Sequence, residues 1–125
     1  NAMKQNFKVK KAITLGSGDI IQDIIDDFIC KLKLKPEFGI RLRDYFETKY
    51  GGKMGDYSAY KAAEVTNIPI LIIHDKDDND VAVAAAYNIH KHLKHAEIMI
   101  TEGLGHRKIL GDDAVIQKII EFISK

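Results

Sequence analysis

The segment IPILIIHDKDD, residues 68–78, decides the fold of this chain. Its apolar residues follow one another without the polar alternation that a half-exposed strand shows. A short run of this kind, opened by Pro69 and closed by charged residues, is typical of a strand covered on both faces, as parallel strands are. We therefore predict a buried parallel strand from Ile68 to His74 and a charged loop over 75–80.

Downstream of this strand the pattern alternates between helix and strand. The spacing of apolar residues predicts a helix over Val81–Leu93, and Ala96–Thr101 is expected to form the next strand. After a loop from Glu102 to Leu110, Asp112 is expected to cap a last helix. Because parallel strands are joined by right-handed crossovers, these units predict a parallel sheet.

Upstream, the residues 8–15 (KVKKAITL) predict a first strand, which Gly16-Ser17-Gly18 ends. Ser17 or Asp19 is expected to cap the helix that follows. Helical spacing then predicts three helices, over about 20–32, 36–50 and 57–64. The predicted fold class is α/β: a small three-stranded parallel sheet flanked by helices, with a helical insertion after the first strand.

Composition restricts the classes of function. Lys and Arg number 19 and Asp and Glu 18, so a formal net charge of +1 gives no argument for nucleic acid or a membrane surface as partner. The single cysteine, Cys30, excludes an intramolecular disulfide, and we expect it to be a small buried hydrophobic residue. The chain has no apolar run of membrane-spanning length and no secretory pattern, so we expect a cytoplasmic protein. Residues 1–3 are interpreted as a tag scar and a start methionine, and residues 4–125 as one domain.

Side chains able to do chemistry follow two strands, at the point where each strand ends. Carboxylates follow the central strand, and the next strand is followed by Glu102-Gly103-Leu104-Gly105-His106. The carboxyl ends of parallel strands meet at one edge of a sheet, where active sites collect. A carboxylate and a histidine there can form the acid and the base of an acyl-transfer triad, in which the acid fixes the imidazole tautomer.

Residues 68–110, IPILIIHDKDDNDVAVAAAYNIHKHLKHAEIMITEGLGHRKIL, resemble the C-terminal part of α/β-hydrolase-fold serine hydrolases. That family has the pattern I-P-[VL]-L-x-[IL]-H-G-x-x-D-x-x-V-P, then a helix, a strand and G-x-G-H. The resemblance implies that Asp78 is the acid and His106 the catalytic histidine, with His74 packed beside them. It also implies that residues 19–64 are a cap or lid insertion, and that no metal or organic cofactor is needed.

The chain departs from the family pattern at several positions. Asp75 replaces the family's glycine, and Ala82 replaces its proline. The nucleophile of the family lies in G-x-S-x-G, and none of the three serines, Ser17, Ser58 and Ser124, lies in such a pattern. We therefore expect a truncated serine hydrolase, whose parent activity on an ester or amide acyl bond is absent from the isolated chain.

Two further hypotheses concern partners. The chain is alternatively a non-catalytic binding or assembly module, or one half of a split hydrolase whose partner chain supplies the serine. In either case the strand at 8–15 lacks its neighbour, and a bare edge is a template for pairing. We expect a homodimer or larger assembly through that edge, with a small acyl compound as the substrate.

Rival interpretations of the acidic segment fit less well. As a calcium loop starting at Asp75, it has Asp80 at the sixth position, where glycine is required, and Ala86 at the twelfth, where glutamate is required. As an aspartyl-phosphatase motif it has Asn79 where threonine or valine is expected. The aromatic residues between 28 and 60 are interpreted as the core of a small helical layer in preference to the lining of a substrate pocket.

Overall fold

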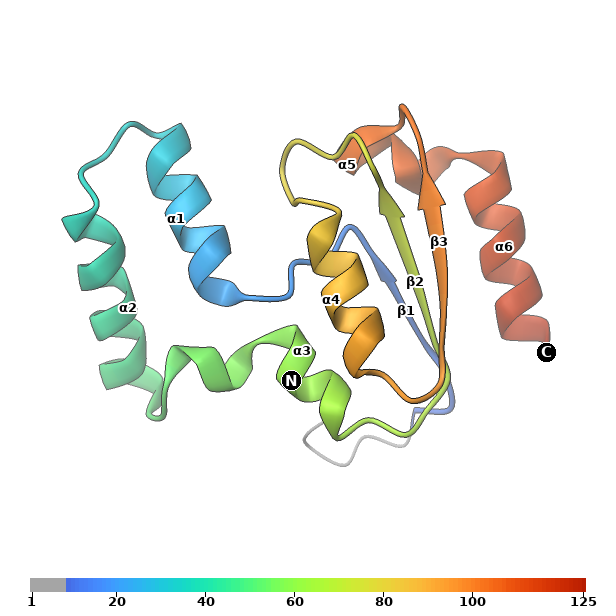
Figure 1. The fold of residues 1–125 in the computed structure, drawn as a ribbon, viewed down its shortest axis with the longest axis horizontal. Coiled ribbons are helices and arrows are strands. Elements are labelled where there is room, and N and C mark those ends of the chain that lie inside the picture. Colours follow the sequence, from blue (N-terminus) through green and yellow to red (C-terminus); the bar gives the residue numbers. More distant parts are fainter. Residues whose placement is uncertain (1–8) are drawn as a thin grey trace.

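The computed structural model describes residues 9–125, so residues 1–3, which we interpret as a tag scar and a start methionine, and Lys8 lie outside the described residues. A three-stranded parallel sheet has the order β1 (Ala12–Leu15), β2 (Ile70–Asp75), β3 (Ala96–Thr101) (Figure 1). The third strand has the predicted bounds, and the other two differ from their predictions by a few residues at their ends. The predicted α/β class with a small parallel sheet is confirmed.

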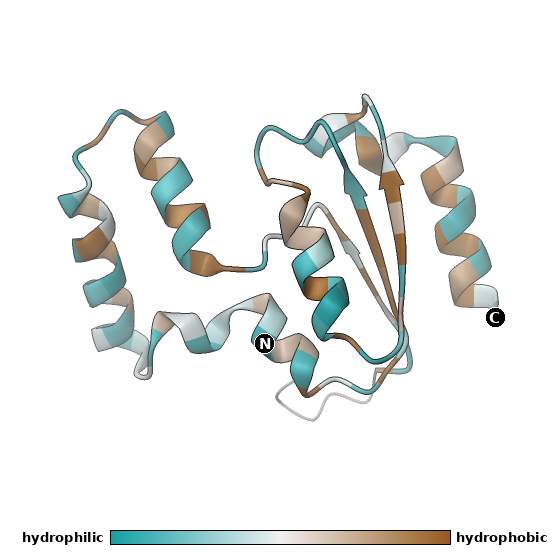
Figure 2. Cartoon of the chain, viewed as in Figure 1, coloured by the Kyte–Doolittle hydropathy of each residue, from teal (hydrophilic) through white to brown (hydrophobic). Residues whose placement is uncertain are grey.

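The central strand is buried along its whole length because helices cover both faces of the sheet. On one face, Ile70 and Ile72 pack against α3 (Ala59–Glu64) and α4 (Ala84–His92). On the other face, Leu71 and Ile73 pack against α6 (Asp113–Ser124). Figure 2 shows the hydrophobic residues concentrated along β2 and β3. Continuous burial explains why the sequence of β2 has no polar alternation.

Two elements near the strand ends differ from the sequence-based expectation. Helix α4 begins at Ala84, three residues after the expected start, because the backbone at Val81 is held by other groups: its N–H by Asp78 and its carbonyl by His74. The predicted loop 102–110 contains a short helix, α5 (Gly105–Lys108), which continues into the 3-10 turn η3 (Ile109–Gly111). The predicted cap of α6 is confirmed, since Asp112 Oδ1 accepts from the backbone N–H of Val115 at 3.1 Å.

The insertion contains α1 (Ile21–Lys31), α2 (Glu37–Tyr50), the 3-10 turn η2 (Met54–Tyr57) and α3. Helices α1 and α2 form a hairpin that lies to the left of α4 in Figure 1, with α4 between it and the strands. The prediction that its aromatic residues form a core is wrong for most of them, since these side chains are exposed: Phe28, Phe38, Tyr45 and Tyr50. Cys30 is exposed as well, against expectation. Of the helices in the described part of the chain, none is both long and apolar enough to cross a bilayer.

The predicted cap of α1 is also wrong. Its N-cap is Ile20, and no side chain caps the helix. Asp19 is engaged elsewhere: its Oδ2 accepts from Asn88 Nδ2 on α4 at 2.6 Å, and its backbone carbonyl accepts from the N–H of Ala59 at 2.9 Å. Asp19 therefore ties the start of the insertion to both helices on that face of the sheet.

Candidate active site

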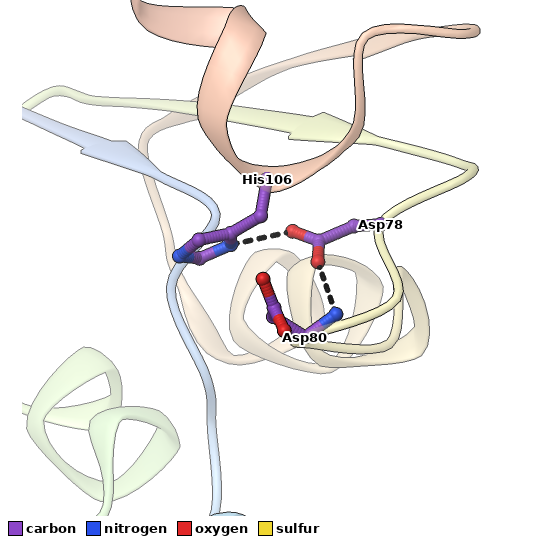
Figure 3. A group of neighbouring side chains, drawn as sticks. All are labelled: Asp78, Asp80 and His106. Atoms are coloured by element: carbon purple, nitrogen blue, oxygen red, sulfur yellow. Dashed lines mark hydrogen bonds and ion pairs between the residues drawn. The ribbon is translucent and has the colours of Figure 1, made fainter.

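The structure brings together the two residues that the sequence singles out. Asp75 of β2 pairs with Thr101 of β3 in the sheet register, so the segments that follow the two strands start side by side. Asp78 lies three residues beyond β2, and His106 lies on α5, just beyond β3. The Nδ1 atom of His106 is 2.8 Å from Oδ2 of Asp78 (Figure 3).

The carboxylate of Asp78 is buried and held in one orientation. Its side chain is only 1% exposed. Oδ1 accepts hydrogen bonds from the backbone N–H groups of Asp80 and Val81, both at 2.8 Å. Burial alone would raise the pKa of Asp78, but these N–H groups and His106 outweigh it, so the pKa lies below its usual value. Asp78 is therefore an ionised acceptor aimed at the imidazole.

His106 is placed to exchange a proton on the side facing away from Asp78. Its side chain is 37% exposed. The carboxylate of Asp78 can only accept, so the bond between them places a proton on Nδ1. Nε2 points away from Asp78 (Figure 3), and among residues 9–125 no hydrogen bond to it is formed. A ring with Nδ1 protonated and Nε2 unpaired has the tautomer that a general base requires.

Gly16, at the end of β1, forms the third side of this arrangement. It is buried, its φ is 58°, and its N–H donates to the carbonyl of Ile73 at 3.0 Å. A Cβ atom at this position would lie 2.9 Å from Nδ1 of His106 and 3.4 Å from Oδ2 of Asp78. The sequence indicated only that Gly16 ends a strand. Its contact with the pair depends on the sheet register, which no local pattern reveals.

His74 packs beside the pair and stabilises the loop that carries the acid. The residue is completely buried. Its Nε2 is 2.9 Å from the carbonyl oxygen of Val81, which can only accept, so Nε2 carries a proton. The same nitrogen is 3.5 Å from Oδ2 of Asp78. His74 therefore places an N–H group next to the carboxylate of Asp78.

A pocket of about 550 Å³ lies beside the acid, and Asp78 contributes to its wall. One side is formed by residues 18–27, at the start of the insertion, and the other by residues 78–88. Both charged and apolar side chains line it, among them Asp23, Asp27, Asp80, Ile20, Ile24 and Val81. The amine of Lys31 pairs with two of these carboxylates, Asp27 at 2.7 Å and Asp80 at 3.3 Å.

A metal ion is the other ligand that the site residues could hold. Asp78, Asp80 and His106 each offer one ligand atom within 4.8 Å of the others (Figure 3). However, both oxygens of Asp78 already accept hydrogen bonds, and Nδ1 of His106 is directed at one of them. The arrangement is therefore better suited to an acid–imidazole pair than to a cation.

Within the described part of the chain, no hydrogen bond joins a serine hydroxyl to His106. Ser58 is buried at the start of α3, and its hydroxyl has no hydrogen-bond partner among residues 9–125. Ser17 lines a separate pocket between β1, α3 and α4. The described residues thus provide an acid and a base, but no serine hydrogen-bonded to the base.

Asp75, the departure from the family's glycine, is a second buried carboxylate near the site with several hydrogen-bond donors around it. It is completely buried, and its oxygens accept from the Thr101 hydroxyl, Leu104 N–H and Asp77 N–H at 2.7, 3.0 and 2.9 Å. Burial alone would raise the pKa of Asp75, but the Thr101 hydroxyl and the backbone N–H groups outweigh it and hold the pKa at about 2.

This pKa predicts an acid-dependent loss of stability. The carboxyl titrates at 3.8 when unperturbed and at about 2 in the folded chain, so its contribution is complete above 3.8 and disappears as the pH falls towards 2. Urea unfolding at a series of pH values checks this for the wild type and Asp75→Asn. The stability difference between the two should be constant above about pH 5 and should shrink between about pH 4 and 2. A difference that is independent of pH would contradict the assignment.

The chain is similar to known proteins both in sequence family and in structure. The family model of TAP-like proteins matches residues 53–125. A meta-cleavage product hydrolase from Pseudomonas fluorescens is similar in structure, with a TM-score of 0.61, 15% identity, and coverage of 98% of this chain and 58% of that one. The α/β-hydrolase MGS-M2, from a deep-sea metagenome of the Medee basin, has a TM-score of 0.65 at 15% identity, with 99% and 59% covered.

An acylaminoacyl peptidase from Pyrococcus horikoshii has a TM-score of 0.68 at 16% identity, with 99% of this chain and 21% of that one covered. None of the curated proteins matches the chain in sequence. The chain spans between half and two thirds of the length of the first two of these structures. At these identities the likeness shows a shared fold.

Proposed function

The chain belongs to the TAP-like family of α/β-hydrolase-fold proteins, and from that premise we propose that it supplies the acid and the histidine of a serine-hydrolase site without supplying the nucleophile. The observation that carries the proposal is the 2.8 Å contact between His106 Nδ1 and the buried, oriented carboxylate of Asp78. The roles assigned to the two residues by the resemblance are the roles that this geometry supports.

The pair can perform the two proton transfers of acyl transfer. Asp78 holds the proton on Nδ1, so that Nε2 can take a proton from a hydroxyl as its oxygen attacks an acyl carbon. The resulting imidazolium is stabilised by the adjacent carboxylate. Nε2 then gives the proton to the leaving alcohol or amine as the carbon–heteroatom bond breaks. A water molecule next attacks the acyl carbon with the same two proton transfers, which releases the carboxylic acid product.

The remaining parts of such a site must come from outside these residues. The 125 residues contain no G-x-S-x-G pattern, which would carry the serine and one oxyanion donor. Each missing oxyanion donor leaves the barrier higher by about 2.7–4 kcal/mol. We therefore expect the isolated chain to be inactive, with the nucleophile supplied by another segment or by a partner chain.

The insertion supports a further part of the proposal. Residues at the start of α1 form one wall of the pocket beside Asp78. A helical segment in that position acts as a cap, as the family resemblance implies for residues 19–64. The pocket then receives the acyl substrate between the cap and the segment carrying the acid.

Labelling with a fluorophosphonate, which reacts with activated serines, tests where the nucleophile resides. The 125-residue chain should remain unlabelled, because none of its serines is bonded to His106. Strong labelling that disappears in His106→Ala would show that one of these serines is activated by the pair, and would contradict the proposal. The DNA preceding the Met3 codon gives an independent check, since a G-x-S-x-G about 20–40 residues upstream favours a hydrolase.

The edge of the sheet supports an assembly proposal. In the described residues, β1 pairs with β2 alone, so its other edge is free for a further strand. We expect a second copy to pair there in the absence of a completing segment, which gives a homodimer. Light scattering coupled to chromatography checks the mass, and a monomer at high concentration would contradict self-association. A stable dimer without any completing serine would favour the alternative of a non-catalytic assembly module.

A further inference from the structure

We propose that Asp75 is a positioning residue that clamps the segment carrying His106 and thereby keeps the Nδ1 atom of His106 directed at Asp78. The proposal rests on the role given above to the Asp78–His106 pair. It gives a role to residue 75, where this chain has an aspartate and the family pattern has glycine.

The clamp is visible in the contacts of the two carboxylate oxygens. Oδ2 of Asp75 accepts from the Thr101 hydroxyl at 2.7 Å and from the Leu104 N–H at 3.0 Å. Oδ1 accepts from the N–H of Asp77 at 2.9 Å. One carboxylate thus joins the end of β3 and the residue two positions before His106 to the segment that carries Asp78.

The residue that Asp75 holds lies between two glycines. Gly103 and Gly105 flank Leu104 with φ values of 78° and 63°, a region that glycine adopts readily, and the Leu104 side chain packs against the core. Leu104 lies between the two glycines, and its N–H donates a hydrogen bond to Asp75. Fixing it limits the rotation of the backbone that leads into α5, and so limits where the imidazole can lie.

The backbone N–H of Lys76 donates to the carbonyl of Thr101 at 2.9 Å, and two further side-chain contacts join the same segments at exposed positions. Oδ2 of Asp77 accepts from the N–H of Gly103 at 2.8 Å, at an exposed position. Lys76 and Glu102 form an ion pair whose side chains are also exposed. Exposed pairs of this kind contribute little, whereas buried hydrogen bonds to a charged group contribute more. Asp75 therefore adds a completely buried side-chain connection between the two segments.

Glycine at this position could not replace the clamp. Without the carboxylate, the Thr101 hydroxyl and the Leu104 N–H would lose their acceptor inside the protein, which is costly unless water enters. The carboxylate at this position reaches both the end of β3 and the segment that leads to His106.

The test is a long-range ¹⁵N–¹H spectrum of the imidazoles in the 125-residue chain, which reports the protonated ring nitrogen of each histidine. In the wild type, His106 should be protonated at Nδ1. In Asp75→Asn, whose amide keeps a single acceptor oxygen for three donors, we expect this signature to weaken, with His106 exchanging between tautomers. His92 serves as an internal reference, because its Nδ1 is 2.7 Å from the carbonyl of Asn88, far from the clamp in the sequence, and should stay protonated in both proteins.

Matched variants separate positioning from general stability. Thr101→Val removes one donor to Asp75 and Thr101→Ser keeps it, so the Nδ1 signature of His106 should weaken in the first and persist in the second. Asp77→Asn should leave it unchanged. If Asp75→Asn does not fold, the comparison of the two Thr101 variants decides, and equal spectra for them would overturn the proposal.

Two other results would overturn it. One is an unchanged His106 signature in folded Asp75→Asn, and the other is a parallel change in His92, which indicates a general loss of structure. The spectrum requires no nucleophile and no turnover. A failure to find serine-dependent hydrolysis would therefore contradict the proposed function and leave the positioning role of Asp75 standing on its own evidence.

Discussion

Replacing Asp78 with alanine is expected to lower the free energy of unfolding by roughly 3–5 kcal/mol, because several donors lose one buried acceptor together. The N–H groups of Asp80 and Val81 and the ring of His106 all lie 2.8 Å from its oxygens. The first two fix the turn that precedes α4. Urea unfolding followed by circular dichroism at neutral pH measures the change.

Asp80→Ala is the matched control. It removes a carboxylate from the same segment, but that side chain is half exposed and its ion pair with Lys31 is exposed too. We expect a change within about 0.5 kcal/mol. Asp78→Asn should fall between the two, since it keeps one acceptor oxygen. Equal losses for Asp78→Ala and Asp80→Ala would show that Asp78 is an ordinary turn residue.

Gly16→Ala is expected to cost roughly 2–4 kcal/mol and to separate His106 from Asp78. The added Cβ would lie 2.9 Å from Nδ1 and 3.0 Å from Cε1 of His106, closer than atoms can pack. The backbone adds to this cost because φ is 58°, a conformation that alanine adopts with difficulty. The imidazole has to move, and the hydrogen bond to Asp78 is then broken.

Gly103→Ala separates the steric part from the backbone part. Gly103 has a φ of 78°, but a Cβ there meets nothing within 4 Å. We expect this variant to cost only about 1–2 kcal/mol, from backbone strain. Thermal unfolding of both variants, with the Nδ1 signature of His106 as a second readout, measures the difference. If Gly16→Ala is no more costly than Gly103→Ala, the close approach of β1 to the pair is wrong.

The strands could be predicted from the sequence because their determinants are local, and the Asp78–His106 pairing could be predicted from the family resemblance of residues 68–110. The apolar run from Ile70 to Ile73 requires cover on both faces, and the glycine context of His106 is specific. The first turn of α4 could not be predicted in the same way. Val81 has helical spacing, but His74 and Asp78 compete for its backbone groups, and those contacts depend on how the segment folds back.

The roles of Gly16 and Asp75 were hidden for a related reason. Each acts on a segment remote in sequence: Gly16 on His106, and Asp75 on Thr101 and Leu104. A departure from a family pattern shows that a side chain has changed, without showing which donors it meets. The exposed faces of α1 and α2 were mispredicted because helical spacing of Phe28 or Phe38 indicates one apolar side and gives no information about what covers it.

Hydrolysis of a p-nitrophenyl ester, measured on the chain alone and on the chain extended through the codons that precede Met3, decides whether Asp78 and His106 act as acid and base. We expect only background hydrolysis by the 125 residues, and serine-dependent turnover by an extended chain that includes a G-x-S-x-G segment. In that extended chain, His106→Ala should lower kcat/KM by roughly 10³-fold or more, because proton transfer through Nε2 is lost. Undiminished hydrolysis by the extended chain carrying His106→Ala would contradict the assignment of Asp78 and His106 as the acid and base.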